Sequence, residues 1–101
     1  MAEVRVYVTR FCGYCVAAKR LLGARKVAFE EVDVTGDAAM RAWLVKTTGR
    51  RTVPQVFVGG NPIGGYEELA ALERSGELAA MLRREVEGGE SEGPPPQQPG
   101  R

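Results

Sequence analysis

Two cysteines separated by two residues are the most reactive side chains in this sequence. Cys12 and Cys15 enclose Gly13 and Tyr14, and the chain has no other cysteine and no histidine. Such a pair is a redox dithiol, half of a metal site, or two buried inert thiols. A structural zinc site needs four ligands, usually cysteine or histidine, so one copy of this chain cannot complete it. The position of the pair in the fold separates the two remaining interpretations.

The pair lies where a predicted strand is followed by a predicted helix. Residues 4–8 are β-rich and alternating, and residues 14–24 carry apolar side chains at helical spacing. Unpaired N–H groups and the macrodipole at a helix start favour an anion, so we expect a stabilised thiolate at Cys12. Arg10 adds positive charge nearby. The pattern therefore favours a redox dithiol, with Cys12 as nucleophile and Cys15, one turn further on, as the resolving thiol.

The remaining elements complete the order β-α-β-α-β-β-α-α. The sequence predicts a strand over 27–34, a helix over 38–48 capped by Asp37, a hairpin of 54–58 and 62–64 around a Gly-Gly-Asn turn, and helices over 66–74 and 77–84. Strands joined through a helix are expected to be parallel, and the hairpin adds antiparallel strands. We therefore expect the α/β class and a thioredoxin-like fold, a four-stranded mixed sheet flanked by helices. Trp43 is predicted to pack in the core.

Composition limits the kind of protein this chain can be. Its 101 residues, 44% apolar and 27% charged, predict one globular domain over 1–86, and the Pro- and Gly-rich residues 87–101 predict a disordered tail. A net charge of +1 predicts no nucleic-acid surface, and no apolar run approaches the ~20 residues that cross a membrane. Two cysteines are too few for a secreted disulfide scaffold, and residues 1–5 lack a signal-peptide pattern. We expect a cytoplasmic location.

Three motifs, separated by the spacing that one protein family shows, carry a resemblance to that family. They are Cys12-Gly13-Tyr14-Cys15, Thr52-Val53-Pro54-Gln55-Val56-Phe57 and Ile63-Gly64-Gly65-Tyr66-Glu67-Glu68-Leu69. Together they resemble the glutaredoxin family, specifically its short bacterial dithiol members, over residues 3 to about 84. The resemblance implies a thioredoxin fold, a cis-proline at Pro54, and a groove for glutathione as co-substrate. It implies an oxidoreductase that reduces protein disulfides and protein–glutathione mixed disulfides.

The resemblance also implies which residues bind glutathione. In addition to Arg10, the implied contacts are Tyr14, Arg51, Thr52, Val53, Pro54, Gly65, Tyr66 and Glu67. The Val53 backbone would pair with the cysteinyl part of glutathione, and the helix start at Gly65 would hold the γ-glutamyl carboxylate. Arg50 or Arg51 would meet the glycyl carboxylate, and we assign this contact to Arg51.

Three positions depart from the family pattern. Thr9 stands where a lysine is frequent, Tyr66-Glu67 replaces the commoner Cys-Asp, and Gly13 replaces proline between the cysteines. Members with glycine or serine at that last position more readily hold a [2Fe-2S] cluster between two monomers, with the first cysteine and bound glutathione as ligands. The resemblance thus implies an alternative function as an iron–sulfur carrier, with Cys12 as the ligand. Without a cluster we expect a monomer.

Overall fold

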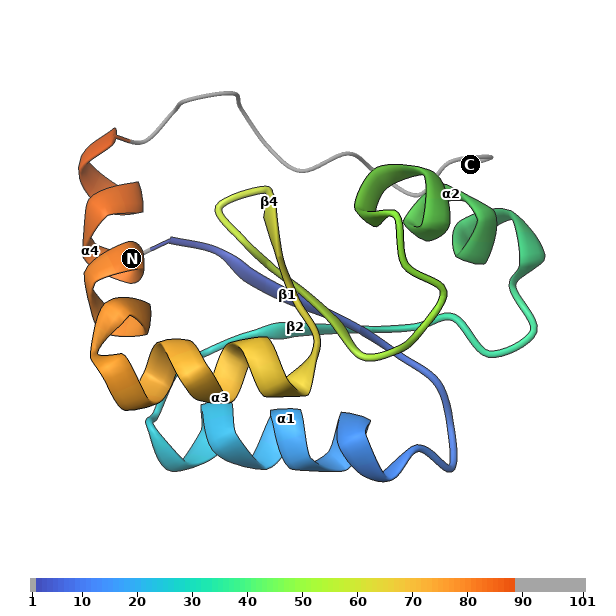
Figure 1. The fold of residues 1–101 in the computed structure, drawn as a ribbon, viewed down its shortest axis with the longest axis horizontal. Helices are drawn as coiled ribbons and strands as arrows, with labels where there is room; N and C mark the ends of the chain where they lie inside the picture. Colours follow the sequence, from blue (N-terminus) through green and yellow to red (C-terminus); the bar gives the residue numbers. More distant parts are fainter. Residues whose placement is uncertain (1, 89–101) are drawn as a thin grey trace.

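The computed structural model describes residues 2–88, which form four strands and four helices (Figure 1). The strands are β1 (Val4–Val8), β2 (Glu30–Asp33), β3 (Gln55–Val58) and β4 (Asn61–Gly64). The helices are α1 (Gly13–Ala24), α2 (Ala38–Thr48), α3 (Tyr66–Ser75) and α4 (Glu77–Gly88). Their order along the chain is the predicted one. Helix α4 includes residues 87 and 88, and the rest of the predicted tail lies outside the described residues.

The strands form one mixed sheet in the order β2-β1-β3-β4. Strand β1 pairs parallel with β2 and antiparallel with β3, and β3 pairs antiparallel with β4. Helices α1 and α3 lie side by side on one face, while α2 covers the other (Figure 1). The prediction of a thioredoxin-like α/β fold is confirmed.

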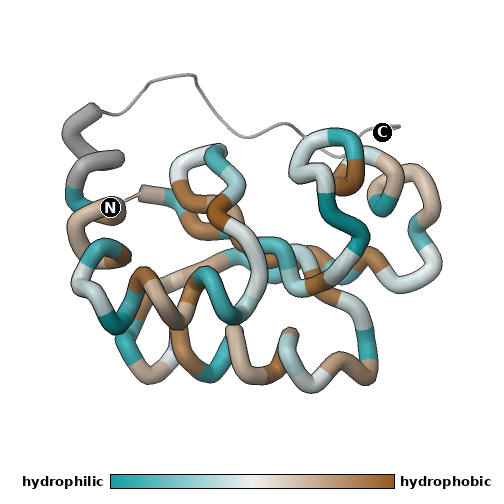
Figure 2. The backbone as a smooth tube through the Cα atoms, viewed as in Figure 1, coloured by the Kyte–Doolittle hydropathy of each residue, from teal (hydrophilic) through white to brown (hydrophobic). Residues whose placement is uncertain are grey.

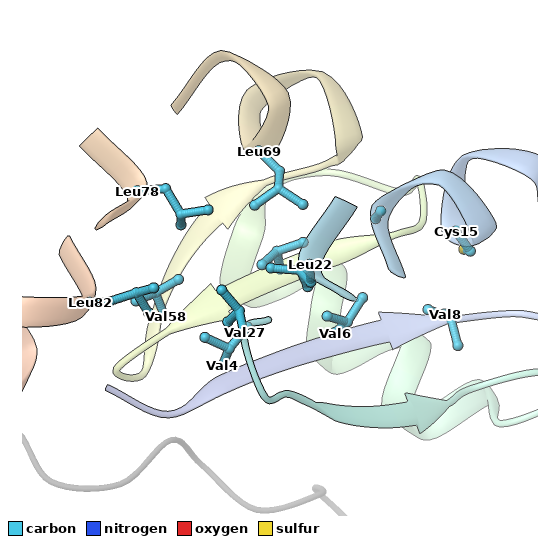
Figure 3. Close-up of a cluster of buried hydrophobic side chains, with 12 residues drawn as sticks. Val4, Val6, Val8, Cys15, Leu22, Val27, Val58, Leu69, Leu78 and Leu82 are labelled. Atoms are coloured by element: carbon cyan, nitrogen blue, oxygen red, sulfur yellow. The ribbon is translucent and has the colours of Figure 1, made fainter. Parts of the chain in front are cut away.

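Each face of the sheet has its own apolar core, because side chains alternate along a strand. Under α1 and α3, the side chains of Leu22, Leu69 and Leu78 converge on the valines of β1 and β3 (Figure 3). Hydrophobic and hydrophilic segments alternate along these helices, as expected of helices with one buried face (Figure 2). Under α2, Trp43 packs with Tyr7 and Phe57 at ring-centroid distances of 5.7 and 5.8 Å. The predicted packing role of Trp43 is confirmed.

The predicted second strand is too long. Strand β2 covers only Glu30–Asp33, because the ladder with β1 runs from the Arg5–Glu30 pair to the Val8–Asp33 pair. The backbone N–H of Val27 instead donates to the Leu22 carbonyl, closing the end of α1. Val27 still packs in the core under α1, so its apolar character reports burial and not strand pairing.

Two local signals position the ends of the other elements. The Asp37 carboxylate accepts the Met40 N–H at 3.0 Å, which confirms the predicted cap of α2. The hairpin turn is Gly59-Gly60, with φ of 60° and 87°, and Asn61 already pairs with Val58. Among residues 2–88, no helix is long and apolar enough to cross a membrane.

Candidate active site

Cys12 is the N-cap residue of α1. Its backbone is extended, with φ of −121° and ψ of 112°, and its sulfur accepts the Cys15 backbone N–H at an Sγ–N distance of 3.3 Å. The first turn of a helix has N–H groups without carbonyl partners, so a sulfur at the cap satisfies one of them. A negative charge at Cys12 Sγ therefore faces a hydrogen-bond donor and the positive end of the α1 dipole.

Cys15 is placed differently from Cys12, although both thiols are unbridged. Its side chain packs in the core under α1 and is only 1% exposed, whereas Cys12 is half-buried. Burial raises the pKa of the Cys15 thiol to about 11, and the hydrogen bond with the Cys12 side chain acts in the same direction. Cys15 is therefore protonated at neutral pH and shielded from solvent, whereas the Cys12 sulfur is partly exposed.

The segment before β3 brings its backbone against Cys12. The Val53–Pro54 peptide bond is cis, as the resemblance implied. The Cys12 Sγ lies 3.8 Å from the Val53 carbonyl oxygen, to which a protonated thiol donates a weak hydrogen bond. Val53 also packs against both cores. Val53 is thus anchored by apolar contacts on both faces of the sheet, while its carbonyl oxygen lies beside the Cys12 sulfur.

Val53 is also part of the lining of a groove of about 270 Å³. The residues that line it are Tyr14, Arg50, Thr52, Val53, Pro54, Gly65, Tyr66, Glu67 and Glu68. They come from the start of α1, the segment before β3 and the start of α3. The Tyr14 and Tyr66 rings lie 6.2 Å apart between centroids. The structure therefore brings together seven of the residues expected to bind glutathione.

Two expected residues lie outside this lining. The Arg10 side chain faces Asp33, with its Nε 3.6 Å from the carboxylate, and its backbone N–H donates to the Thr35 hydroxyl. Hydrogen bonds from Thr35, with a smaller effect of Arg10, hold the pKa of Asp33 below its ordinary value. Arg51 is exposed and its carbonyl accepts a hydrogen bond from Arg41. Neither guanidinium lines the groove.

Arg50 is the arginine that lines the groove, and its partner there is Glu68. The Arg50 Nη1 lies 3.3 Å from Glu68 Oε2, while Glu68 Oε1 accepts the Gly65 N–H at 2.8 Å. These contacts, the Gly65 N–H first, hold the pKa of Glu68 below its ordinary value. Sequence reasoning did not single out Glu68 as a site residue. Its position three residues after the helix cap is the capping-box spacing, which is a usable signal.

Two consecutive glycines make room for this arrangement. Gly64 has φ of +116°, and a Cβ there would lie 2.7 Å from Glu68 Cγ. A Cβ at Gly65 would lie 3.2 Å from the Pro54 carbonyl oxygen. A side chain at Gly64 would therefore displace Glu68, and one at Gly65 would press against the Pro54 backbone. Gly64 leaves room for the Glu68 side chain, and Gly65 allows the start of α3 to approach the Pro54 segment.

The described residues hold no group of three or more His, Cys, Asp and Glu side chains that could bind a metal ion. Of the two thiols, the half-buried Cys12 is the one that a bound molecule can reach, since Cys15 lies in the core. The site is built for thiol chemistry beside a ligand groove. A thioredoxin-like fold with such a dithiol at a helix start defines a thiol–disulfide oxidoreductase.

Comparison with known proteins places the chain within that class. The glutaredoxin family model matches residues 4–63. The chain is 42% identical over 83 residues to glutaredoxin 3 of Escherichia coli K12, an alignment that covers 82% of this chain and all of that protein. It is 43% identical over 82 residues to a glutaredoxin of Pseudomonas aeruginosa PAO1, covering 81% and 98%. The chain belongs to the glutaredoxin family, as the three motifs indicated.

Solved structures agree with this assignment. The crystal structure of a buckwheat glutaredoxin–glutathione complex superposes with a TM-score of 0.77 at 32% identity, covering 82% of this chain and 78% of that one. The holo form of glutaredoxin C1 from Populus tremula x tremuloides gives a TM-score of 0.78 at 32% identity, covering 84% and 79%. The chain is thus an oxidoreductase whose fold and sequence both match glutaredoxins.

Proposed function

We propose that this chain uses glutathione to reduce protein–glutathione mixed disulfides and protein disulfides. The observation that carries the proposal is the position of Val53, which lines the groove and also lies 3.8 Å from the Cys12 sulfur. A ligand that binds in the groove beside Val53 is therefore close to the Cys12 sulfur. The similarity to a buckwheat glutaredoxin that was crystallised with glutathione supports the same ligand here.

The groove has a feature for each part of glutathione. The Thr52–Pro54 segment is not in a strand, so the backbone of Val53 is free to pair with the cysteinyl residue of the ligand. The first N–H groups of α3 at Tyr66 and Glu67 suit the γ-glutamyl carboxylate. Arg50 suits the glycyl carboxylate, and we prefer it to Arg51 because its side chain lines the groove.

The proposed reaction consists of two thiol–disulfide exchanges. The Cys12 thiolate attacks the glutathione sulfur of a protein–glutathione mixed disulfide, the S–S bond breaks, and the protein leaves as a thiolate that takes up a proton. A second glutathione thiolate then attacks the glutathione sulfur held on Cys12. Glutathione disulfide forms and the Cys12 thiolate is restored, so each turnover consumes one glutathione thiol and releases one protein thiol.

Cys15 serves protein disulfides in this proposal. After Cys12 has formed a mixed disulfide with a substrate protein, Cys15 loses its proton, attacks the Cys12 sulfur and releases the substrate as a dithiol. Burial raises the pKa of Cys15, so the loss of this proton is a necessary part of the step at neutral pH. The Cys12–Cys15 disulfide formed in this step is then reduced by two glutathione thiolates in turn, which leave as glutathione disulfide. We further propose that the chain works as a monomer in the cytoplasm, a compartment that keeps thiols reduced.

Single serine variants of the two cysteines test the proposal. With a glutathionylated peptide and glutathione as reductant, Cys12→Ser abolishes turnover, whereas Cys15→Ser retains most of it. With a protein disulfide as substrate, both variants lose activity, because release then requires the second thiol. Small and equal losses of deglutathionylation in the two variants would refute the assigned roles.

A bridging [2Fe-2S] cluster is the second candidate function. Gly13 supports it through the family resemblance, in which glycine between the cysteines accompanies cluster binding. A side chain at this position would meet no atom within 4 Å, so packing within one chain does not itself require glycine there. Cys12 of two copies and two bound glutathione molecules would supply the ligands. Anaerobic reconstitution with iron, sulfide and glutathione, followed by absorption spectroscopy and size measurement, gives a coloured dimer if the candidate is right. A colourless monomer eliminates it, and Gly13→Pro is the matched variant in which a genuine cluster becomes less stable.

A further inference from the structure

Gln55 is an unusual residue in this core. It is 0% exposed and is the only buried polar side chain identified within residues 2–83, whose side chains the structure describes. Val56 and Val58 pack under α1 and α3, and Phe57 packs under α2. Since side chains alternate along a strand, Gln55 lies on the same face as Phe57. An apolar side chain is the ordinary occupant of such a position.

The amide of Gln55 is only partly satisfied. Its Nε2 donates to the Thr52 carbonyl oxygen at 2.9 Å and lies 3.4 Å from the Thr52 hydroxyl, but its Oε1 is buried without a hydrogen-bond partner in the described part of the chain. A buried acceptor without a partner destabilises the folded state, whereas an apolar side chain of the same size carries no such penalty. Stability of the fold therefore does not account for glutamine at this position.

What the amide does provide is a fixed Thr52 carbonyl. Thr52, Val53 and Pro54 form one wall of the groove, and none of them is held in a strand or helix. Gln55 holds this wall from its buried side, while the opposite side faces the groove and Cys12. A binding edge that is already ordered loses less conformational entropy when a ligand binds.

We propose that Gln55 is a positioning residue for the glutathione groove. Its buried amide orients the Thr52–Pro54 wall so that the Val53 backbone faces the ligand in the conformation that pairs with it. This inference rests on the proposed function of the groove. It assigns Gln55 no contact with glutathione and no step in the exchange reaction.

The test replaces Gln55 by methionine, which has a similar length and shape but no hydrogen-bond donor. Binding of S-methylglutathione, which cannot undergo disulfide exchange, is measured by titration of the full reduced chain. We expect its Kd to rise about three- to tenfold, the effect of losing one net hydrogen bond. The KM for a glutathionylated peptide rises with it, while kcat stays within about twofold of the wild-type value.

Stability is measured on the same variant by urea unfolding. Because methionine removes the buried acceptor without a partner, Gln55→Met unfolds at the same or a higher urea concentration than the wild type. Met40→Leu is the matched control, a volume-conserving change in the core on the same face of the sheet. It leaves Kd, KM and kcat unchanged.

Each other outcome overturns the inference. If Gln55→Met binds S-methylglutathione like the wild type, or loses stability with an unchanged KM, Gln55 has only a structural role. Gln55→Leu is the second variant, and failure of both variants to fold also assigns Gln55 a structural role alone. If the wild-type chain neither binds S-methylglutathione nor turns over the peptide, the proposed function itself fails. If the wild type is active and Gln55→Met has the same Kd and KM, the Gln55 inference fails and the proposed function stands.

Discussion

Because the Cys15 thiol is buried, the stability of the fold decreases as the pH rises through the alkaline range. Burial first, and then the hydrogen bond with Cys12, raise the pKa of this thiol from 9.0 to about 11. In the unfolded chain Cys15 titrates near its ordinary value. Between these two pH values the folded state therefore keeps a proton that the unfolded state has released. The resulting stabilisation is fully present below pH 9 and is lost as the pH rises through 11.

The size of this effect follows from the difference of about two pKa units. Such a difference corresponds to about 3 kcal/mol in the free energy of unfolding. About 1 kcal/mol is lost by pH 10 and about 2 kcal/mol by pH 11, since the transition is spread over the interval. The side chain is only 1% exposed, so solvent screening takes little away from these values.

Urea unfolding of the wild type and of Cys15→Ala, between pH 8 and 11 with a reductant present, measures this loss. The titrations of tyrosines and lysines are common to both proteins and cancel in the difference. Repeating the comparison in a Cys12→Ser background removes the contribution of the second thiol. The advantage of the wild type over Cys15→Ala should shrink steadily above pH 9. An advantage that stays constant up to pH 11 would show that burial does not hold the proton on Cys15.

Two further predictions concern the end of the groove at α3. Glu68→Ala lowers the free energy of unfolding by about 1 kcal/mol because the Gly65 N–H loses its acceptor, and Glu68→Gln, which keeps an acceptor, lowers it less. The wild type is more stable than Glu68→Gln by less than about 1 kcal/mol in the free energy of unfolding, because the ion pair with Arg50 is exposed. This difference is present above pH 4.5 and disappears as the pH falls through the lowered pKa of Glu68. Gly64→Ala destabilises the fold by about 1–3 kcal/mol, because φ at Gly64 is +116° and the new Cβ would lie 2.7 Å from Glu68 Cγ. The new Cβ of Gly13→Ala meets no atom within 4 Å, so this variant changes stability by less than about 1 kcal/mol. Urea titrations of the four variants check both predictions, and equal effects of the two glycine variants would contradict the second.

The fold was largely predictable because its signals are local. Asp37 three residues before Met40, and the Gly59-Gly60 pair between two apolar runs, act through backbone groups only a few residues away. Such effects are readable without knowledge of the tertiary structure. Residues 27–29 were misassigned for the opposite reason. Their apolar pattern reports burial, but the length of β2 depends on where β1 offers partners.

The lining of the groove was only partly predictable. Arg50 and Arg51 are adjacent in sequence and chemically identical, yet Arg50 lines the groove and Arg51 does not. Which one does so depends on how α3 presents Glu68 to the segment before β3. Arg10 is likewise engaged by Asp33, a residue at the end of strand β2. In both cases the deciding partner is distant in sequence, and residue type alone gives no indication of it.

The sequence alone predicted Cys12 as the reactive thiol, since a cysteine between a strand and a helix is exposed to the helix dipole wherever the rest of the chain packs. It also determined the order of elements and, through three motifs, the family. Only the tertiary structure showed that Val53 lies 3.8 Å from Cys12, that Cys15 is 1% exposed, and that Gln55 holds Thr52 from the core. These features depend on packing between segments far apart in the chain, and the burial that packing creates also raises the pKa of Cys15.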